Sequence, residues 1–339
     1  MIVHRLAVLW MLTLALAVVV SAAEPQAQVG TPPRLAQIED FAPPEEFIDI
    51  GGLKTHFVHK GELGRVIVLL HGFGSSTYTW RLNLDEFSKK YRVYAIDIKG
   101  FGLTAKPRDG NYHVGAYADH LLGFLDAMKI DKATIAGNSM GGAVALNLAL
   151  RHPNRVEGLV LVDAAPLDYE AKMTSLRPKM ETPNNERTEP ETQSVLKMVL
   201  TRALVNKSFI EAGLKGAYHH PEAFVTPEMI DKYHQPLLID GALEALAAMG
   251  WRPRTAPIPP IGTLKIPVLI IWGRHDQVIP VAVADTFVKS IPGSKKVVLE
   301  ESGHLPHEEE AKTFNRLVTE FVADLPIPPV VDALAPAKP

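Results

Sequence analysis

Three polar residues have the types and the order needed for nucleophilic catalysis. Ser139 is the centre of a Gly-Asn-Ser-Met-Gly run, Asp276 ends a Trp-Gly-Arg-His-Asp run, and His304 follows Ser-Gly. A serine hydroxyl becomes a nucleophile when a histidine removes its proton and a carboxylate orients that histidine. The chain order is serine, acid, histidine, with separations of 137 and 28 residues, so only the fold can bring them together. We predict that Ser139, Asp276 and His304 form a catalytic triad.

The surroundings of Ser139 predict a sharp turn between a strand and a helix. The apolar run at 133–137 precedes it, and the almost wholly apolar run at 141–150 follows it. Such a turn holds its serine in a strained backbone conformation, and side chains at the flanking positions would collide there, so glycine is required. The alternative is a glycine-rich turn that only packs.

A second turn is expected to face the same serine. His71-Gly-Phe-Gly follows the apolar strand predicted at 66–70. We assign the backbone amides of Phe73 and Met140 to an oxyanion hole, in which one donor contributes about 3–4 kcal/mol of transition-state stabilisation. The alternative is an ordinary turn at the end of a strand. His71 itself is expected to be a structural, hydrogen-bonded histidine rather than a base.

Other residues compete for the same roles. Asp163, which directly follows the strand predicted at 156–162, is the alternative acid. It precedes Ala-Ala-Pro, however, and could instead cap the following segment. His307 is the nearest alternative base, and we expect it on the surface at the start of a helix. His219 and His220 are adjacent and do not easily face one ion, so we expect no metal and no cofactor.

Strands alternate with helices along most of the chain. Such alternation predicts an α/β fold with a mainly parallel sheet and helices on both faces. Two strands around Gly51-Gly52 form a predicted hairpin, and a one-sided apolar stripe predicts a final helix. The predicted strands are 47–50, 53–60, 66–70, 91–97, 133–137, 156–162, 266–272 and 297–299, and the predicted helices are 117–128, 141–150 and one that carries Phe314, Leu317, Val318, Phe321 and Val322.

One segment interrupts this alternation. Residues 166–264 contain no convincing strand, and helical pieces are predicted at 194–204 and 237–249, so we predict a helical cap inserted after the sixth strand. The catalytic core is then 46–165 together with 265–325. Residues 24–45 and 326–339 are rich in proline and are predicted to be an extended arm and tail.

The N-terminus predicts export. A short basic start at His4 and Arg5 precedes the apolar stretch 6–20, and small residues follow at 21–23. This is the pattern of a signal peptide over residues 1–23, which places the mature protein in the periplasm or outside the cell. The alternative is an uncleaved membrane anchor, since 6–23 is only just short of a spanning helix.

Composition excludes several classes. The net charge of −3 offers no basic surface for nucleic acid, and the 339 residues include no cysteine, which excludes disulfides and cysteine-ligated metals. Mean hydropathy near zero argues against a polytopic membrane protein. We expect a small-molecule substrate, with membrane contact only through an uncleaved N-terminal segment. The sequence leaves the oligomeric state open.

Taken together, these motifs resemble the α/β-hydrolase fold family, in the branch with a serine nucleophile and a helical cap. The matching pieces lie in register over residues 47–325: His71-Gly-Phe-Gly, the run from Asp97 to Pro107, Gly-Asn-Ser-Met-Gly-Gly around Ser139, the run that ends at Asp276, and Gly-His at His304. The resemblance implies an ester hydrolase that forms an acyl-enzyme. Alternatives with the same triad are a carbon–carbon bond hydrolase of ring-cleavage products, a perhydrolase, or a non-catalytic ligand-binding homologue.

Overall fold

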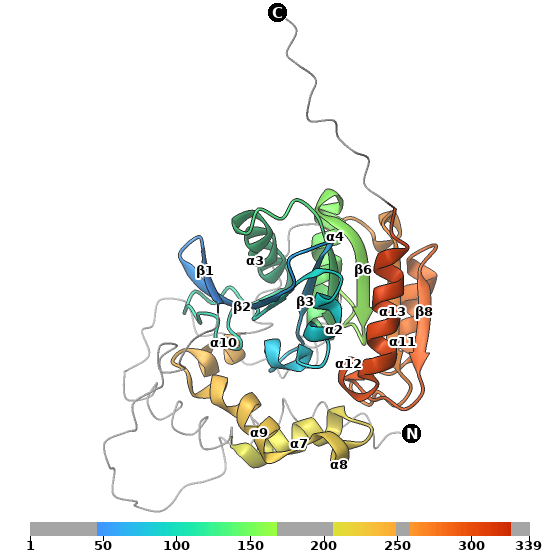
Figure 1. The fold of residues 1–339 in the computed structure, drawn as a ribbon. Coiled ribbons are helices and arrows are strands. Elements are labelled where there is room, and N and C mark those ends of the chain that lie inside the picture. The colour runs from blue at the N-terminus through green and yellow to red at the C-terminus, as the bar shows by residue number, and fades with distance from the viewer. Residues whose placement is uncertain (1–45, 168–205, 249–257, 327–339) are drawn as a thin grey trace, which may run out of the picture.

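One eight-stranded sheet forms the centre of the molecule (Figure 1). The computed structural model describes residues 46–167, 206–248 and 258–326. The strand order is β1-β2-β4-β3-β5-β6-β7-β8, in which β1 and β2 pair antiparallel, as do β2 and β4, and all other pairs are parallel. The strands are β1 Glu46–Ile50, β2 Leu53–Lys60, β3 Val66–Leu70, β4 Arg92–Ile96, β5 Ala133–Asn138, β6 Val156–Val162, β7 Val268–Gly273 and β8 Lys295–Leu299. The predicted hairpin and the mainly parallel sheet are confirmed.

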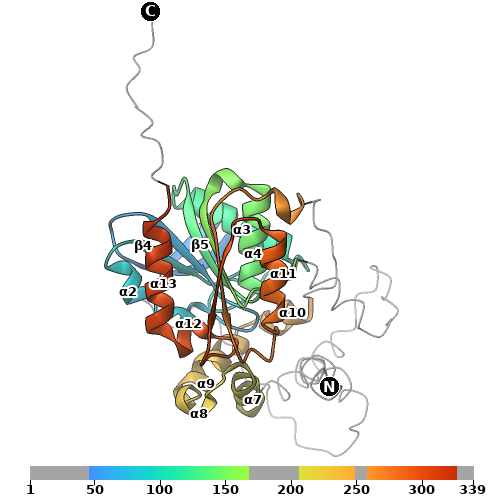
Figure 2. The same cartoon turned by 90° about the vertical axis from the view of Figure 1, so that its right-hand side faces the viewer.

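Helices cover both faces of the sheet (Figure 2). The strand side chains alternate between the two faces. In β3, Val66, Val68 and Leu70 pack into the core under α3, α4 and α11, whereas Ile67 and Leu69 pack on the opposite side against α2 and α13. All five are buried, which explains why β3 is a continuous apolar run in the sequence. The covering helices are α3 Val114–Ala127, α4 Met140–Arg151 and α11 Ala282–Ser290 on one face, and α2 Leu84–Ser88 and α13 Ala311–Ala323 on the other.

A group of helices is inserted between β6 and β7, as predicted, and it lies beyond the carboxyl ends of the parallel strands (Figure 1). Its small core joins Leu214, Tyr218 and Met229 to Leu305, the residue after His304. The inserted helices are therefore packed directly on the loop that carries the predicted base. They are α7 Lys207–Ala217, α8 Pro221–Phe224, α9 Pro227–His234, the 3-10 turn η6 Gln235–Leu238 and α10 Ala242–Ala248.

Several predictions fall outside the described residues. These are the signal peptide, the arm, most of the tail and the helix at 194–204, so the domain boundaries remain predictions. The helix predicted at 237–249 corresponds in part to η6 and α10. Within the ranges that the structure describes, no helix has the length and apolar character needed to cross a membrane.

Candidate active site

Ser139 lies on a strained turn between β5 and α4. Its backbone has φ 53° and ψ −119°, outside the conformations that side-chain-bearing residues usually adopt. The turn is tight because the chain approaches itself on both sides. A Cβ added to Gly137 would lie 2.3 Å from the carbonyl oxygen of Gly141, and one added to Gly141 would lie 2.5 Å from that of Leu70. The predicted need for glycine on both sides of the serine is confirmed.

Replacing Gly141 with alanine should destabilise the protein by more than about 2 kcal/mol, because overpacking against backbone cannot be relieved by a rotamer change. The matched control is Gly213→Ala. Gly213 also lies in a helix, α7, and a Cβ there meets nothing within 4 Å. Alanine at that position should stabilise by about 0.5–1 kcal/mol. Thermal and urea unfolding measure both changes, and equal behaviour of the two variants would contradict the packing described here.

The predicted acid and base are paired. His304 Nδ1 and Asp276 Oδ2 are 2.7 Å apart, and both residues are buried. Asp276 Oδ1 accepts the backbone amides of Val278, at 2.7 Å, and Ile279, at 2.9 Å. These amides fix the carboxylate, so its other oxygen holds the proton on Nδ1 of the histidine. The remaining nitrogen, Nε2, is then the basic one.

The parallel sheet explains why residues so distant in sequence meet. Ser139 follows β5, Asp276 follows β7 and His304 follows β8, and all three strands run in the same direction. Asn138 links the end of β5 to the loop after β8, because its side-chain amide donates to the carbonyl of His304 at 3.0 Å. Among the described residues no hydrogen bond joins the Ser139 hydroxyl to His304. Such bonds are often long without substrate.

His71 holds the turn after β3 through two hydrogen bonds of its ring. His71 Nε2 accepts the Ile98 amide at 3.0 Å, so its Nδ1 carries the proton and donates to the Gly72 carbonyl at 2.7 Å. Because Nε2 accepts a hydrogen bond, the ring is neutral. Burial lowers the pKa of the His71 imidazole in agreement with this, although nearby Asp97 acts in the opposite direction. His71 thus makes the structural hydrogen bonds expected of it.

Fixing that carbonyl also fixes the next amide. In a trans peptide the N–H points opposite to the C=O, so the Phe73 amide is directed away from His71. A Cβ added to Gly72 would lie 3.0 Å from the Cβ of Ser139, which places the turn directly against the serine. Within the described part of the chain, neither the Phe73 amide nor the Met140 amide donates a hydrogen bond. Both donors predicted for the oxyanion hole are therefore unused.

Asp163, the alternative acid, lies in the same cluster. Its side chain is fully buried and accepts the Gly273 amide at 2.9 Å, so the interpretation as a cap for the insertion is wrong. Ligand atoms of Asp163, Asp276 and His304 lie within 4.8 Å of one another. Asp276, not Asp163, contacts the imidazole of His304, at 2.7 Å.

His307 is not at the surface, contrary to our prediction. It is fully buried in the short helix α12 Pro306–Glu309, where its ring packs 4.3 Å from that of Trp80. Its Nε2 lies 2.8 Å from the Thr79 hydroxyl. Burial lowers the pKa of His307 well below its usual value. Thr79 and Trp80 enclose its ring, and Asp276 pairs with His304 instead, so the structure gives no support to His307 as the base.

Sequence reasoning missed two carboxylates that hold the inserted helices against the site. Glu308 is buried and receives the Tyr218 hydroxyl at 2.7 Å and Arg81 at 2.6 Å. Glu309 accepts the amides of Gly303, at 2.6 Å, and His219, at 2.7 Å. In the sequence they belong to a run of three glutamates, which is typical of a solvated helix face. No signal there indicated burial.

The adjacent histidines differ from expectation as well. Ligand atoms of His219, His220 and Glu301 lie within 4.8 Å of one another, so the two histidines do converge. His219 also stacks on His275 with ring centroids 3.7 Å apart. All of these residues are at least partly exposed, and none of them belongs to the predicted triad.

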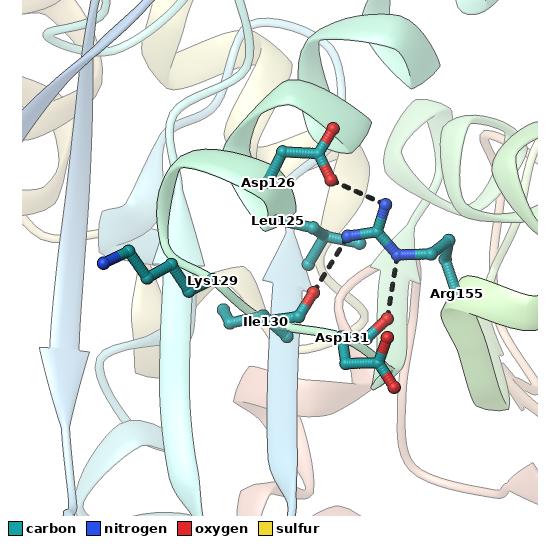
Figure 3. A pocket seen from close by; sticks show the side chains of 6 residues that line it. All are labelled: Leu125, Asp126, Lys129, Ile130, Asp131 and Arg155. Atoms are coloured by element: carbon teal, nitrogen blue, oxygen red, sulfur yellow. Dashed lines mark hydrogen bonds and ion pairs between the residues drawn. The ribbon is translucent and has the colours of Figure 1, made fainter. Parts of the chain in front are cut away.

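A surface hollow at the opposite end of the sheet is already filled by an internal network (Figure 3). It adjoins the start of β5, whereas Ser139 follows the end of that strand. The Arg155 guanidinium donates to the carbonyls of Asp131 and Ile130 and to the Asp126 carboxylate. The other residues that line it are Leu125 and Lys129. We assign no role to this hollow.

The chain belongs to the α/β-hydrolase fold family, whose model matches residues 65–311. This agrees with the sheet, the serine turn and the acid–histidine pair described above. The protein is accordingly a hydrolytic enzyme of that family.

Several hydrolases align with most of this chain. A 2-hydroxymuconate semialdehyde hydrolase from Pseudomonas sp. (strain CF600) is 31% identical over 286 residues, which cover 80% of this chain and 92% of the relative. Among solved structures, a serine hydrolase involved in carbazole degradation has a TM-score of 0.65 and 26% identity, covering 82% of this chain and 98% of that one. A mutant of a meta-cleavage product hydrolase from Pseudomonas fluorescens IP01 has a TM-score of 0.64 and 28% identity, covering 82% and 97%.

Proposed function

We propose that this enzyme hydrolyses a bond to a carbonyl carbon through Ser139, with His304 as base and Asp276 as its orienting acid. The observation that carries the proposal is the 2.7 Å contact between His304 and Asp276 at the sheet edge where the Ser139 turn lies. The unused amides of Phe73 and Met140 supply the oxyanion hole. No step of this scheme requires a metal or a cofactor.

The reaction proceeds in two halves. His304 Nε2 takes the Ser139 proton as Oγ adds to the carbonyl carbon, and the oxyanion is held by the two amides. The intermediate collapses to an acyl-enzyme, and the imidazolium gives its proton to the departing fragment. Water then loses a proton to His304 and attacks the acyl carbon. The acid is released and Ser139 recovers its proton.

The substrate class that we propose is a 2-hydroxy-6-oxo-dienoate from ring cleavage. Relatives named as hydrolases of 2-hydroxymuconate semialdehyde and of 2-hydroxy-6-oxo-2,4-heptadienoate support it, because they align over more than nine-tenths of their own length. In this chemistry the proton of the 2-hydroxyl first moves to C5, so the electron pair of the broken C5–C6 bond can pass along the conjugated chain to the C2 oxygen and leave as a dienolate. The imidazolium of His304 supplies the proton that this dienolate takes up.

Ester hydrolysis is the second candidate. The described site contains each group that an ester needs, namely a nucleophile, a base with its acid and two amide donors. The predicted export signal also favours it, since ring-cleavage products are usually cytoplasmic catabolites. An ester needs no prior proton shift, and the imidazolium protonates an alkoxide oxygen instead of a dienolate; the rest of the scheme is unchanged.

One assay separates the candidates. The purified full-length protein is given 2-hydroxymuconate semialdehyde and 2-hydroxy-6-oxo-2,4-heptadienoate, and in parallel p-nitrophenyl esters of short and medium chain length, with Ser139→Ala as the control. Serine-dependent loss of the dienoate chromophore, at a kcat/KM above that for every ester, supports the carbon–carbon hydrolase. The opposite ranking supports the esterase. If the folded protein turns over neither class, both proposals are overturned.

A further inference from the structure

The Asp163 carboxyl lies in an environment that does not suit a second negative charge beside the triad. Asp163 is fully buried at the end of β6, and Asp276 and His304 share its cluster within 4.8 Å. Glu309 of α12 adds a further negative charge that acts on Asp163. Two carboxylates so close together cannot both ionise at low cost in a buried site.

The hydrogen bonds of the two carboxyls show which of them is the anion. Asp276 accepts two backbone amides on Oδ1 and faces His304 Nδ1 through Oδ2, so each of these three contacts comes from a donor. Asp163 accepts one amide, that of Gly273, on Oδ1. Its Oδ2 is buried, and no donor among the described residues reaches it. An acceptor left alone there is costly, whereas an O–H there has a carboxylate to bind.

We propose that Asp163 is a positioning residue that stays protonated and donates a hydrogen bond from Oδ2 to the Asp276 carboxylate. The kinetic part of this proposal rests on the proposed function of the triad. Burial raises the pKa of Asp163 well above its usual value, and the charge of Asp276 and the hydrogen bond to it act in the same direction. The Gly273 amide acts in the opposite direction but does not outweigh them.

The shared proton has two effects on catalysis. It holds the Asp276 carboxylate in the orientation that faces His304, in addition to the two amides on the other oxygen. It also withdraws charge from Asp276, which keeps the proton of the imidazolium on His304 rather than letting it move to the acid. A neutral Asp163 thereby leaves one negative charge, not two, beside the imidazolium.

Replacing Asp163 with asparagine or with glycine distinguishes a role of the hydrogen bond that it donates from a role of a negative charge at this position. The backbone there has φ 43°, a left-handed conformation that asparagine and glycine accept readily. Asp163→Asn keeps a donor of the same shape and should change kcat/KM by less than about twofold. Asp163→Gly removes the donor and should lower kcat/KM by about 10- to 100-fold, as expected for a lost hydrogen bond to a charged group. With more charge left on Asp276, the acid limb of its pH profile should move to higher pH, whereas the limb of Asp163→Asn should not move.

A second measurement needs no substrate, so it stands even if the proposed reaction is wrong. A carboxyl whose pKa is raised by folding stabilises the native state fully below its unfolded pKa of about 3.9, and this contribution is lost as pH rises toward the folded pKa. Asparagine does not titrate. Asp163→Asn should therefore gain stability relative to wild type as pH rises from about 4 to neutrality. Infrared spectra of the wild type at neutral pH should show a protonated carboxyl band that the variant lacks.

Three outcomes would overturn the proposal. Loss of activity in Asp163→Asn equal to that in Asp163→Gly would mean that an ionised carboxylate is required at this position. Absence of both the infrared band and the pH-dependent stability difference would mean that Asp163 is not protonated. Loss of wild-type activity or stability after dialysis against EDTA would mean that a cation, not a proton, neutralises the pair.

Discussion

Changing Ser139 to alanine should lower kcat by about four to six orders of magnitude on whichever substrate the enzyme accepts. The hydroxyl is the only group at the turn that can form the acyl-enzyme, and the amides of Phe73 and Met140 then have no covalent intermediate to hold. The loss should fall on kcat rather than KM, because the substrate still binds. Steady-state kinetics and a test for acyl-enzyme by mass spectrometry measure the change.

The fold should survive this substitution. Ser139 makes its hydrogen bonds through the backbone, including its amide to the Val162 carbonyl at 2.9 Å, and alanine keeps these. Any difference between alanine and serine in the strain of holding φ at 53° should change the free energy of unfolding by no more than about 1–2 kcal/mol. Ser88→Ala, on the short helix α2, is the matched control and should leave turnover unchanged. Substantial turnover by Ser139→Ala would remove this serine from the mechanism.

Changing Asp276 to asparagine should lower kcat/KM by about three to four orders of magnitude, because the imidazole is left in the wrong tautomer. If the amide nitrogen faces His304, it donates to Nδ1, and the imidazole proton moves to Nε2, which can then no longer act as a base. If the amide oxygen faces His304, the nitrogen meets the donating amides of Val278 and Ile279. Either orientation loses interactions that the carboxylate makes.

The same substitution at Asp163 should have a much smaller effect on kcat/KM than it has at Asp276. Asp276→Asn should be severely impaired and Asp163→Asn almost normal, although both change one buried carboxyl of the same cluster. Asp285→Asn, an exposed aspartate on α11, is the control for a surface substitution and should be neutral. The reverse ranking, with Asp163→Asn the impaired variant, would show that the two acids have exchanged roles. The pH dependence of kcat/KM measured on all three variants makes the assignment.

The serine turn could be predicted because its determinants are local. A strand, a glycine-flanked serine and a helix follow one another within 19 residues, from Ala133 to Arg151, and both elements are apolar enough to be recognised. The short helix α2 could not be predicted in the same way. Its five residues do not complete two turns, and a 3.6-residue period has no length over which to appear.

The choice between the two acids required tertiary structure. Asp163 and Asp276 each follow a parallel strand, β6 or β7, and these strands are neighbours, so both acids arrive at the same edge. The sequence favoured Asp276 only indirectly, because Asp163 precedes Ala-Ala-Pro, and it did not show which carboxyl contacts His304. That is decided by backbone amides: Asp276 binds those of its own following turn, whereas Asp163 binds that of Gly273 on the next strand.

The sequence by itself determined the mainly parallel sheet, the helical insertion, the strained serine and the order of the predicted triad residues, because periodicity and glycine spacing report local conformation. Only the tertiary structure showed that His307, Glu308 and Asp163 are buried, and which residues their side chains contact. Polar residues in a run look solvated in sequence, and burial depends on elements that arrive from elsewhere in the chain: Thr79 and Trp80 against His307, and Tyr218 of the inserted helices against Glu308. A local pattern of polar and apolar residues does not indicate such long-range packing.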